Sequence, residues 1–231
     1  MNPVSSYLKT RVPYLTYDVS KYLKKGDNVI AVWHAAGWTR WTRIREHRKI
    51  PFAFKAQAEI KTGNKSRTLV SDESWKCAKS HSEYIGKWDI HDFGGELIDA
   101  RRIVRGWNTA AFNDEAWANA AIARGKFPKF LSAQMVEPQV KYEELTPASV
   151  TKNDDGSYLV DMGVNYSGFF SIDLKGGKAG EPVTIEISDI KGVRCNKSQK
   201  SQYIFDETGE GTFMNRFNLA GGRWFTIAGL S

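Results

Sequence analysis

The chain has 231 residues, of which 41% are hydrophobic and 13% aromatic, which is enough apolar material for a packed core and argues against disorder as its main state. Its net charge of +7 permits nucleic acid, acidic polysaccharide or an anionic membrane surface as partner but selects none of them, and a soluble basic protein is the simpler interpretation. Two cysteines, Cys77 and Cys195, are too few for a disulfide framework or a metal site built on thiolates.

Residues 1–20 contain neither the apolar core nor the small-residue cleavage site of a signal peptide. The chain also lacks a run of about 18 apolar residues that would cross a membrane. We therefore expect no membrane partner and no export signal within this chain, and its compartment stays unknown.

Short runs of β-branched and aromatic residues dominate the chain and predict strands. Several of these runs alternate apolar and polar residues, as strands with one buried face do. The predicted strands are residues 14–19, 28–33, 51–60, 67–71, 157–162, 168–174 and 182–188. Turns rich in glycine, asparagine and aspartate separate them at residues 24–28, 61–65, 153–156 and 175–180. This spacing is typical of antiparallel sandwiches, so we predict an all-β fold.

Helical periodicity is scarce. Residues 18–26 could form one short helical turn closed by Gly26, and residues 113–121 could form another with Asn113 or Asp114 as its N-cap. Both are expected to be connectors. Between residues 125 and 138 the strand signals stop and two prolines occur, which predicts a module boundary and divides the chain into residues 1–127 and 128–231.

Residues 37–49, "GWTRWTRIREHRK", combine two tryptophans with a basic run. They could be a nucleic-acid surface, a sugar-binding platform or an ordinary loop and strand edge. Basic residues elsewhere are dispersed and balanced by 26 acidic residues, so we expect no nucleic-acid partner. Tryptophan rings fill cores or stack on sugar rings, and the core is the more frequent role. Trp38, Arg40 and Trp41 are the candidates for sugar contact.

Sequence signals of an active site are absent: there is no phosphate loop, no HExxH and no GxSxG elbow, and no spacing singles out a pair of acids. Residues 91–99, "HDFGGELID", bring acidic side chains together as a calcium or sugar-binding loop would. A solvated loop is favoured, because EF-hand spacing is missing. The calcium candidates are Asp92, Glu96 and Asp99, and Glu96, Asp99 and Arg101 are candidates for carbohydrate binding.

Several segments in order resemble bacterial α-L-rhamnosidases of glycoside hydrolase family 78. In the first module these are "YLTYDVSKYLKKGDNVIAVWHAAGW", "SDESWK" (71–76), "GGELIDAR" (94–101) and "GWNTAAFNDEAWANA" (106–120). In the second, "VEPQVKYEELTPASV" and "GSYLVDMGVNYSGFFSIDLKGGKAGEPVTIEIS" resemble the family's concanavalin-like sandwich, with its Asp-x-Gly-x-Asn-x-x-Gly pattern at Asp161, Gly163, Asn165 and Gly168. Residues 209–230 are similar to that sandwich's closing strands.

The resemblance implies two antiparallel β-sandwich domains: a jelly-roll or galactose-binding-like module at 1–127, truncated at its start, and a concanavalin-like module at 128–231. Family enzymes hydrolyse terminal α-L-rhamnose with inversion, using acids on an (α/α)6 barrel that follows these sandwiches. Because the chain stops before that barrel, no residue here maps onto the catalytic acids. We expect it to be inactive alone.

The partners that the resemblance implies are a downstream catalytic barrel and a rhamnose-containing carbohydrate. Some family members bind rhamnose through calcium in an accessory sandwich, which makes calcium the only cofactor to consider. This sequence reads Ala35-Ala36-Gly37-Trp38-Thr39 where the family usually has a polar residue before Gly-Trp, which weakens a site carried over at that turn. A free-standing carbohydrate-binding module is the alternative, and missing strands would expose apolar surface and promote self-association.

Overall fold

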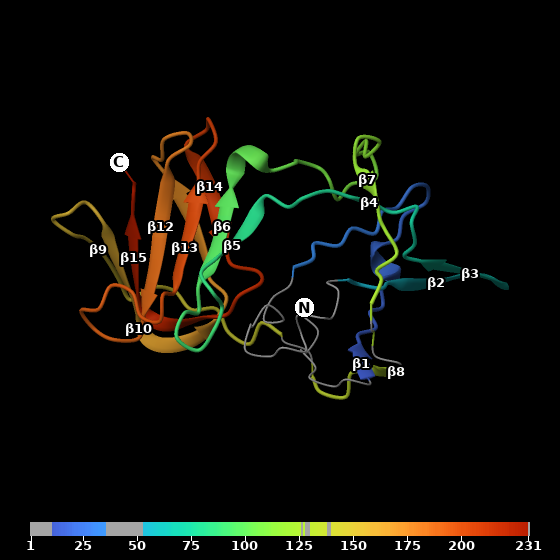
Figure 1. Ribbon diagram of the computed structural model, residues 1–231, viewed down its shortest axis with the longest axis horizontal. Helices are drawn as coiled ribbons and strands as arrows, with labels where there is room; N and C mark the ends of the chain where they lie inside the picture. The colour runs from blue at the N-terminus through green and yellow to red at the C-terminus, as the bar shows by residue number, and fades with distance from the viewer. Residues whose placement is uncertain (1–10, 36–52, 126, 128–129, 138–139, 231) are drawn as a thin grey trace. The chain divides into compact units, whose positions relative to one another are not determined.

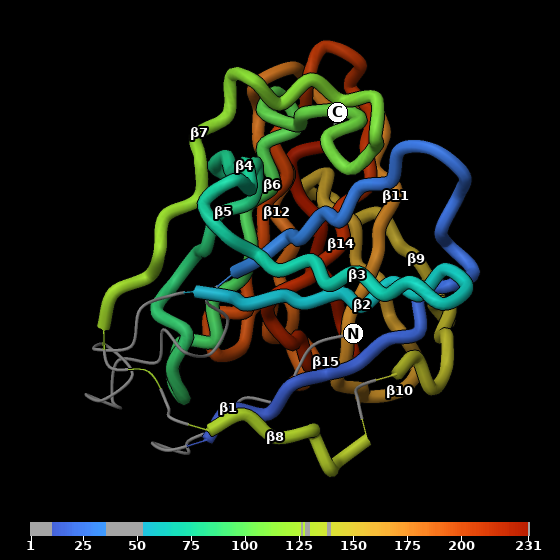
Figure 2. The backbone as a smooth tube through the Cα atoms, turned by 90° about the vertical axis from the view of Figure 1, so that its right-hand side faces the viewer, coloured from blue at the N-terminus to red at the C-terminus, as the bar shows by residue number. Residues whose placement is uncertain are grey.

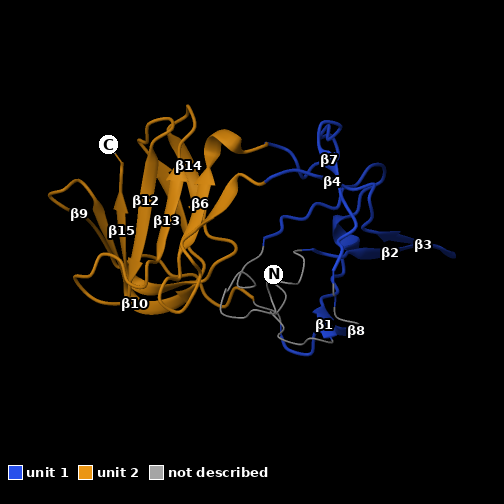
Figure 3. Cartoon of the chain, in the orientation of Figure 1, with its two compact units in different colours: residues 1–35, 45–79, 105–139 blue, residues 36–44, 80–104, 140–231 orange. Residues whose placement is uncertain are grey.

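The computed structural model describes residues 11–35, 53–125, 127, 130–137 and 140–230 (Figure 1). They form two compact units that interleave along the chain (Figure 3). Unit 2 contains the described residues 80–104 and 140–230, and unit 1 contains the other described residues. A single cut between residues 127 and 128 stays a prediction about domains, whereas the compact units exchange segments at residues 80 and 105 as well.

Unit 2 is a β-sandwich whose larger layer is a seven-stranded sheet with the order β5–β6–β13–β12–β15–β10–β9. Its strands are β5 (Ser82–Ile85), β6 (Gly95–Asp99), β9 (Ser149–Lys152), β10 (Tyr158–Gly168), β12 (Pro182–Ser188), β13 (Lys200–Ile204) and β15 (Ala220–Ala228). A two-stranded sheet of β11 (Ser171–Lys175) and β14 (Glu210–Met214) is the smaller layer. Every pairing is antiparallel except that of β6 with β13, which is parallel.

The core of unit 2 follows from strict alternation along β12. Val183, Ile185 and Ile187 are at most 2% exposed, while the residues between them face the other side of the sheet. Each such side chain contributes about 1.5–3 kcal/mol when it leaves water. Leu174 of β11 and Phe213 of β14 join the same buried cluster from the smaller sheet. The all-β fold predicted from the sequence is therefore confirmed.

The described residues of unit 1 form three separate two-stranded sheets. They pair β1 (Arg11–Tyr14) with β8 (Phe130–Ala133), β2 (Gln57–Thr62) with β3 (Lys65–Val70), and β4 (Lys76–Cys77) with β7 (Ala118–Asn119). Strands β2 and β3 form a hairpin that can be followed in Figure 2. None of the described residues of unit 1 is buried. In the part of the chain that the structure describes, no helix has the length and apolar character of a membrane span.

Strand predictions succeeded in both units, most fully in unit 2. The predicted runs 157–162, 168–174 and 182–188 correspond to β10, β11 and β12, and 67–71 and the end of 51–60 overlap with β3 and β2. The prediction for residues 28–33 was wrong, and of residues 14–19 only Tyr14 lies in a strand. A high β-propensity makes a strand only where a neighbour supplies the hydrogen-bond ladder.

The two predicted helical turns have different outcomes. A short 3-10 helix, η1 (Ser20–Tyr22), forms within the first. At the second, Asn113 Oδ1 accepts the N–H of Glu115 and a single turn forms at residues 115–116, but no helix follows and the chain continues into β7.

Candidate functional site

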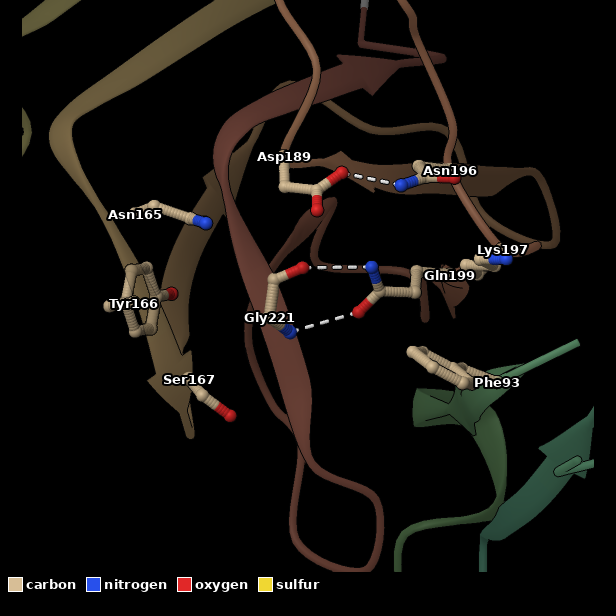
Figure 4. A pocket seen from close by; sticks show the side chains of 9 residues that line it. All are labelled: Phe93, Asn165, Tyr166, Ser167, Asp189, Asn196, Lys197, Gln199 and Gly221. Carbon is tan, nitrogen blue, oxygen red and sulfur yellow. Dashed lines mark hydrogen bonds between the residues drawn. The ribbon is translucent and has the colours of Figure 1, made fainter. Parts of the chain in front are cut away.

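The main candidate site is a pocket of about 480 Å³ in unit 2. It lies where the end of β10, the loop that follows β12, the start of β15 and the loop before β6 meet. Figure 4 shows the β10 residues on one side, Gly221 of β15 in the middle and the loop residues opposite. The lining residues are Phe93, Asn165, Tyr166, Ser167, Asp189, Asn196, Lys197, Gln199 and Gly221.

An irregularity in β10 shapes the first wall. The register of β10 against β15 shifts between Asp161 and Tyr166. Gly163 turns the chain with φ +76°, and its N–H donates to Oδ1 of Asp161 over 2.7 Å. Arg223 donates to both oxygens of the same carboxylate, from Nε over 2.6 Å and from Nη2 over 2.8 Å. The Arg223 guanidinium lowers the pKa of Asp161 from 3.8 to about 2. This clamp holds the bulge that carries Asn165 out of the regular ladder.

The middle of the pocket is fixed by Gln199, which is 5% exposed. Its Nε2 donates to the carbonyl oxygen of Gly221 over 2.8 Å, and the N–H of Gly221 donates back to Oε1 over 2.9 Å. The side-chain amide thereby imitates one rung of a β-ladder. Its hydrogen-bonding groups face Gly221, so Gln199 is suited to hold the pocket together.

The loop between β12 and β13 forms the opposite wall. Asn196 donates from Nδ2 to Oδ1 of Asp189, and the N–H of Phe93 donates to the carbonyl oxygen of Lys197 over 2.8 Å. Lys197 and Ser198 have φ of 53° and 54°, a left-handed conformation that is uncommon outside glycine. These contacts bring Phe93, from a loop about a hundred residues earlier in the chain, beside Lys197.

Several exposed polar side chains in the lining are open to water or to a ligand. The side chains of Asn165, Ser167 and Lys197 hydrogen-bond to no other described residue. Asp189 uses one carboxylate oxygen for Asn196. Tyr166 packs on Phe225 of the core with ring centroids 6.2 Å apart, and burial raises the pKa of its phenol to about 12, so it stays protonated.

The sequence-predicted site residues that the structure describes, Asp92, Glu96, Asp99 and Arg101, do not line this pocket. Trp38, Arg40 and Trp41 lie outside the described residues. Glu96 is 1% exposed, and its Oε1 accepts the N–H groups of residues 216, 217 and 218 over 2.8, 2.6 and 2.9 Å. Burial raises the pKa of Glu96, while these three N–H donors act in the opposite direction. Glu96 therefore anchors the turn between β14 and β15.

The remaining candidates have local partners. Asp99 accepts from Nε and Nη2 of Arg101 over 2.9 and 2.8 Å, and it also caps the 3-10 helix η4 (Ala100–Arg102). Its pKa is lowered, chiefly by the bonds from Arg101. Asp92 has one buried oxygen without a hydrogen-bond partner in the described structure. Among the residues described, no three His, Cys, Asp or Glu side chains are arranged to hold a metal ion. Calcium binding at Asp92, Glu96 and Asp99 stays a prediction without support from this geometry.

Most of the pocket was missed from the sequence. Asn165 belongs to the Asp-x-Gly-x-Asn pattern, which was noticed only as a resemblance. Residues 189–199, "DIKGVRCNKSQ", have no periodicity or motif that would predict a binding site. The buried role of Glu96 had one available signal, its place in a short run with apolar neighbours, "GGELIDA".

Two protein families match the chain in succession. Residues 1–143 match the α-L-rhamnosidase N-terminal domain, and residues 151–231 match the bacterial α-L-rhamnosidase concanavalin-like domain. An α-L-rhamnosidase of Streptomyces avermitilis is 29% identical over 234 residues, which cover 96% of this chain and 22% of that protein. One from Formosa agariphila is 25% identical over 254 residues, covering 100% and 26%. The chain thus spans only a fraction of the length of these curated relatives.

Solved structures of similar fold carry the same name. The crystal structure of the Streptomyces avermitilis α-L-rhamnosidase complexed with L-rhamnose aligns with a TM-score of 0.64 and 25% identity, covering 76% of this chain and 17% of that one. The α-L-rhamnosidase from Dictyoglumus thermophilum aligns with a TM-score of 0.61 and 24% identity, covering 72% and 19%. The second likeness bears on the fold alone.

Proposed function

This chain belongs to the bacterial α-L-rhamnosidase family, and from that membership we propose that it is a non-catalytic accessory part of a larger α-L-rhamnosidase-like glycoside hydrolase. In this role it supports a catalytic barrel and binds rhamnose-containing glycans. The observation that carries the proposal is the succession of two family domains that together align with only 22% and 26% of the larger relatives.

The chemistry of the pocket supports a non-catalytic role. Inverting glycoside hydrolysis needs two carboxyl groups, one as acid and one as base, about 6.5–9.5 Å apart with room for a water molecule. Within the described lining only Asp189 carries a carboxylate. The other polar groups there are amides, hydroxyls and one ammonium, which suit binding better than proton transfer at a glycosidic oxygen.

The absence of catalysis is tested with an aryl α-L-rhamnoside. The purified chain is expected to release no more aryl alcohol than a preparation from cells that carry an empty vector. A rate well above that control would refute the non-catalytic proposal if the activity stayed with the chain through further purification.

Binding is tested by calorimetry with L-rhamnose, in calcium and after chelation. We expect heat of binding in at least one of the two conditions. Loss of binding on chelation would assign calcium a role, with its ligands then to be found by mutation. No heat in either condition would remove simple rhamnose as the ligand.

The supporting role separates this proposal from a free-standing carbohydrate-binding module, which would bind sugar without a barrel. Deleting the aligned segment from the Streptomyces avermitilis enzyme is expected to lower the Tm of the remaining protein, because a packed surface becomes exposed. An unchanged Tm would contradict support and favour the free-standing module.

A further inference from the structure

We propose that the unit 2 pocket between β10 and the β12–β13 loop is a binding site for one neutral pyranose unit with vicinal hydroxyl groups. Of the two segments from which sugar binding was first expected, 91–99 contributes Phe93 to the lining, and 37–49 lies outside the described residues. Only the choice of a rhamnoside as first probe rests on the proposed function.

The unengaged polar groups match a sugar's hydroxyls. Asn165 offers both a donor and an acceptor, Ser167 offers a hydroxyl, and Lys197 offers three donors. All three lie on the lining of one pocket and bond to no other described residue. Asp189 adds a carboxylate whose second oxygen is open to a donor, since Asn196 occupies the first. Groups that both give and accept hydrogen bonds suit a ring of hydroxyls, each of which does the same.

The charges favour a neutral ligand. Asp189 and Lys197 are the only formally charged side chains in the described lining, and their charges are opposite. A uronate or phosphate would meet the Asp189 carboxylate, and an amino sugar would meet the Lys197 ammonium, so each gains on one side and loses on the other. A neutral sugar can accept from Lys197 and donate to Asp189 at once.

Aromatic surface completes the chemistry. Phe93 and Tyr166 both line the pocket and are each partly buried. An aromatic ring offers an apolar face to the C–H side of a pyranose, while the hydroxyls point to the polar wall. The pocket volume of about 480 Å³ lies in the range of small-molecule sites and accommodates a single sugar unit with its hydration.

The site is held in shape before a ligand arrives. The double hydrogen bond between Gln199 and Gly221 joins the loop to β15, and the Phe93-to-Lys197 backbone bond joins it to the segment before β6. The clamp of Arg223 on Asp161 fixes the bulge that presents Asn165. Preorganisation of this kind lowers the entropy lost on binding.

The experiment is a ¹⁵N-labelled titration of the whole chain with methyl α-L-rhamnopyranoside, methyl α-D-mannopyranoside and D-glucuronate. A neutral glycoside is expected to shift the amide signals of residues 165–167, 196–199 and 221 and to saturate with a Kd on the order of 1 mM. Asn165→Ala and Lys197→Ala are each expected to weaken binding about fivefold or more, which corresponds to the loss of one or two hydrogen bonds. Lys178→Ala is the matched control, because Lys178 is exposed and outside the pocket, and it should leave the Kd unchanged.

Each result decides the matter. The proposal is overturned if no neutral glycoside saturates below about 50 mM, a limit far weaker than useful sugar recognition. It is also overturned if D-glucuronate binds more tightly than the neutral probes, or if the shifts lie elsewhere and the pocket variants bind normally. If the shifts lie elsewhere, rhamnose binds at another site, and the proposed function remains while the pocket proposal fails. Mannoside binding that depends on Asn165, without rhamnoside binding, would support the pocket and count against rhamnose as the chain's ligand.

Discussion

Asp161 connects the family pattern to the shape of the site. Its carboxylate receives one backbone N–H from Gly163 and two bonds from Arg223. Because the folded pKa is about 2 and the ordinary value is 3.8, the native state holds the ionised form more strongly than the unfolded state does. The stability from this group is therefore present above about pH 4 and is lost as the pH falls toward about 2.

Replacing the guanidinium should remove that pH dependence. In Arg223→Met, the free energy of unfolding is expected to be lower than in the parent at pH 6, and the difference should shrink as the pH falls below about 4. Urea unfolding followed by tryptophan fluorescence from pH 2.5 to 7 provides the measurement, with Lys178→Met as control for the loss of a surface cation. A difference that is the same at every pH would show that Arg223 acts through packing alone.

The ionisation of Glu96 affects the stability of the fold in the opposite direction to that of Asp161. Its folded pKa is raised by burial, so its ionisation disfavours the folded state as the pH rises above the ordinary value of 4.5. Its Oε1 is nevertheless the acceptor for three successive N–H groups. The fold therefore depends on the shape of the Glu96 side chain and on its acceptor oxygen, whereas ionisation of the buried carboxyl group lowers the free energy of unfolding.

Two substitutions separate the acceptor from the charge. Glu96→Gln keeps an acceptor oxygen and is expected to be as stable as the parent at pH 7, or more so, and to lose stability less as the pH rises from 4.5 to 7. Glu96→Ala leaves the N–H of buried Asn218 without its acceptor and should cost about 2–4 kcal/mol. Denaturant unfolding at pH 5 and 7 checks both. If Glu96→Gln were as destabilised as Glu96→Ala, the ionised carboxylate itself would be required.

The sequence identified some of these residues but not their roles. Asp161, Gly163 and Asn165 were marked by a family pattern, and the structure explains the spacing as an acceptor, a positive-φ turn and a pocket residue. Asp189 and Gln199 could not be found in this way, because loop residues obey no hydrophobic period and their neighbours are set by tertiary contacts. An isolated acid such as Glu96 is equally ambiguous until its three donors are known.

At the scale of elements, alternation was a reliable guide only where one face is buried. Strand β12 alternates and was predicted with its observed limits. Strand β6 is buried at four of its five positions, on both faces, and carries two acids, so no period-two pattern was available and it was not predicted as a strand. Its parallel pairing with β13 joins segments about a hundred residues apart, which local sequence cannot reveal.

The position of β6 inside the sheet makes a prediction about chain cleavage. Strand β6 pairs with β5 on one side and β13 on the other, and Glu96 adds three bonds to the turn before β15. A protease recognition sequence inserted after Ile122, which is 64% exposed, should allow cleavage without releasing the N-terminal piece. Size-exclusion chromatography of the cut protein is expected to show both fragments together, and denaturing gels to show them apart. With Glu96→Ala the fragments should separate more readily; complete separation of the parent fragments would contradict this account of the sheet.

At the scale of the molecule, the order of segments along the chain sufficed to predict the family and the all-β class. The membership of each compact unit was not predicted, because residues 80–104 leave the segment around them and complete the sheet of unit 2. Prolines and a loss of strand signal predict a linker, but they cannot reveal a strand that is contributed from the other side of such a linker.

The two units should differ sharply in stability. None of the described residues in unit 1 is buried, and its sheets have two strands each, which are marginal by themselves in water. Unit 2 encloses a continuous buried cluster. Hydrogen exchange read by mass spectrometry should therefore find the amides of β12 and β15 exchanging only with global unfolding, and those of β2 and β3 exchanging at least a hundredfold faster, equivalent to about 2.7 kcal/mol or more.

Repeating the measurement over a hundredfold range of protein concentration tests the expected self-association: protection of β2 and β3 that rises with concentration would support it. Equal, concentration-independent protection in both units would contradict the difference in stability, because it would require unit 1 to draw its order from unit 2.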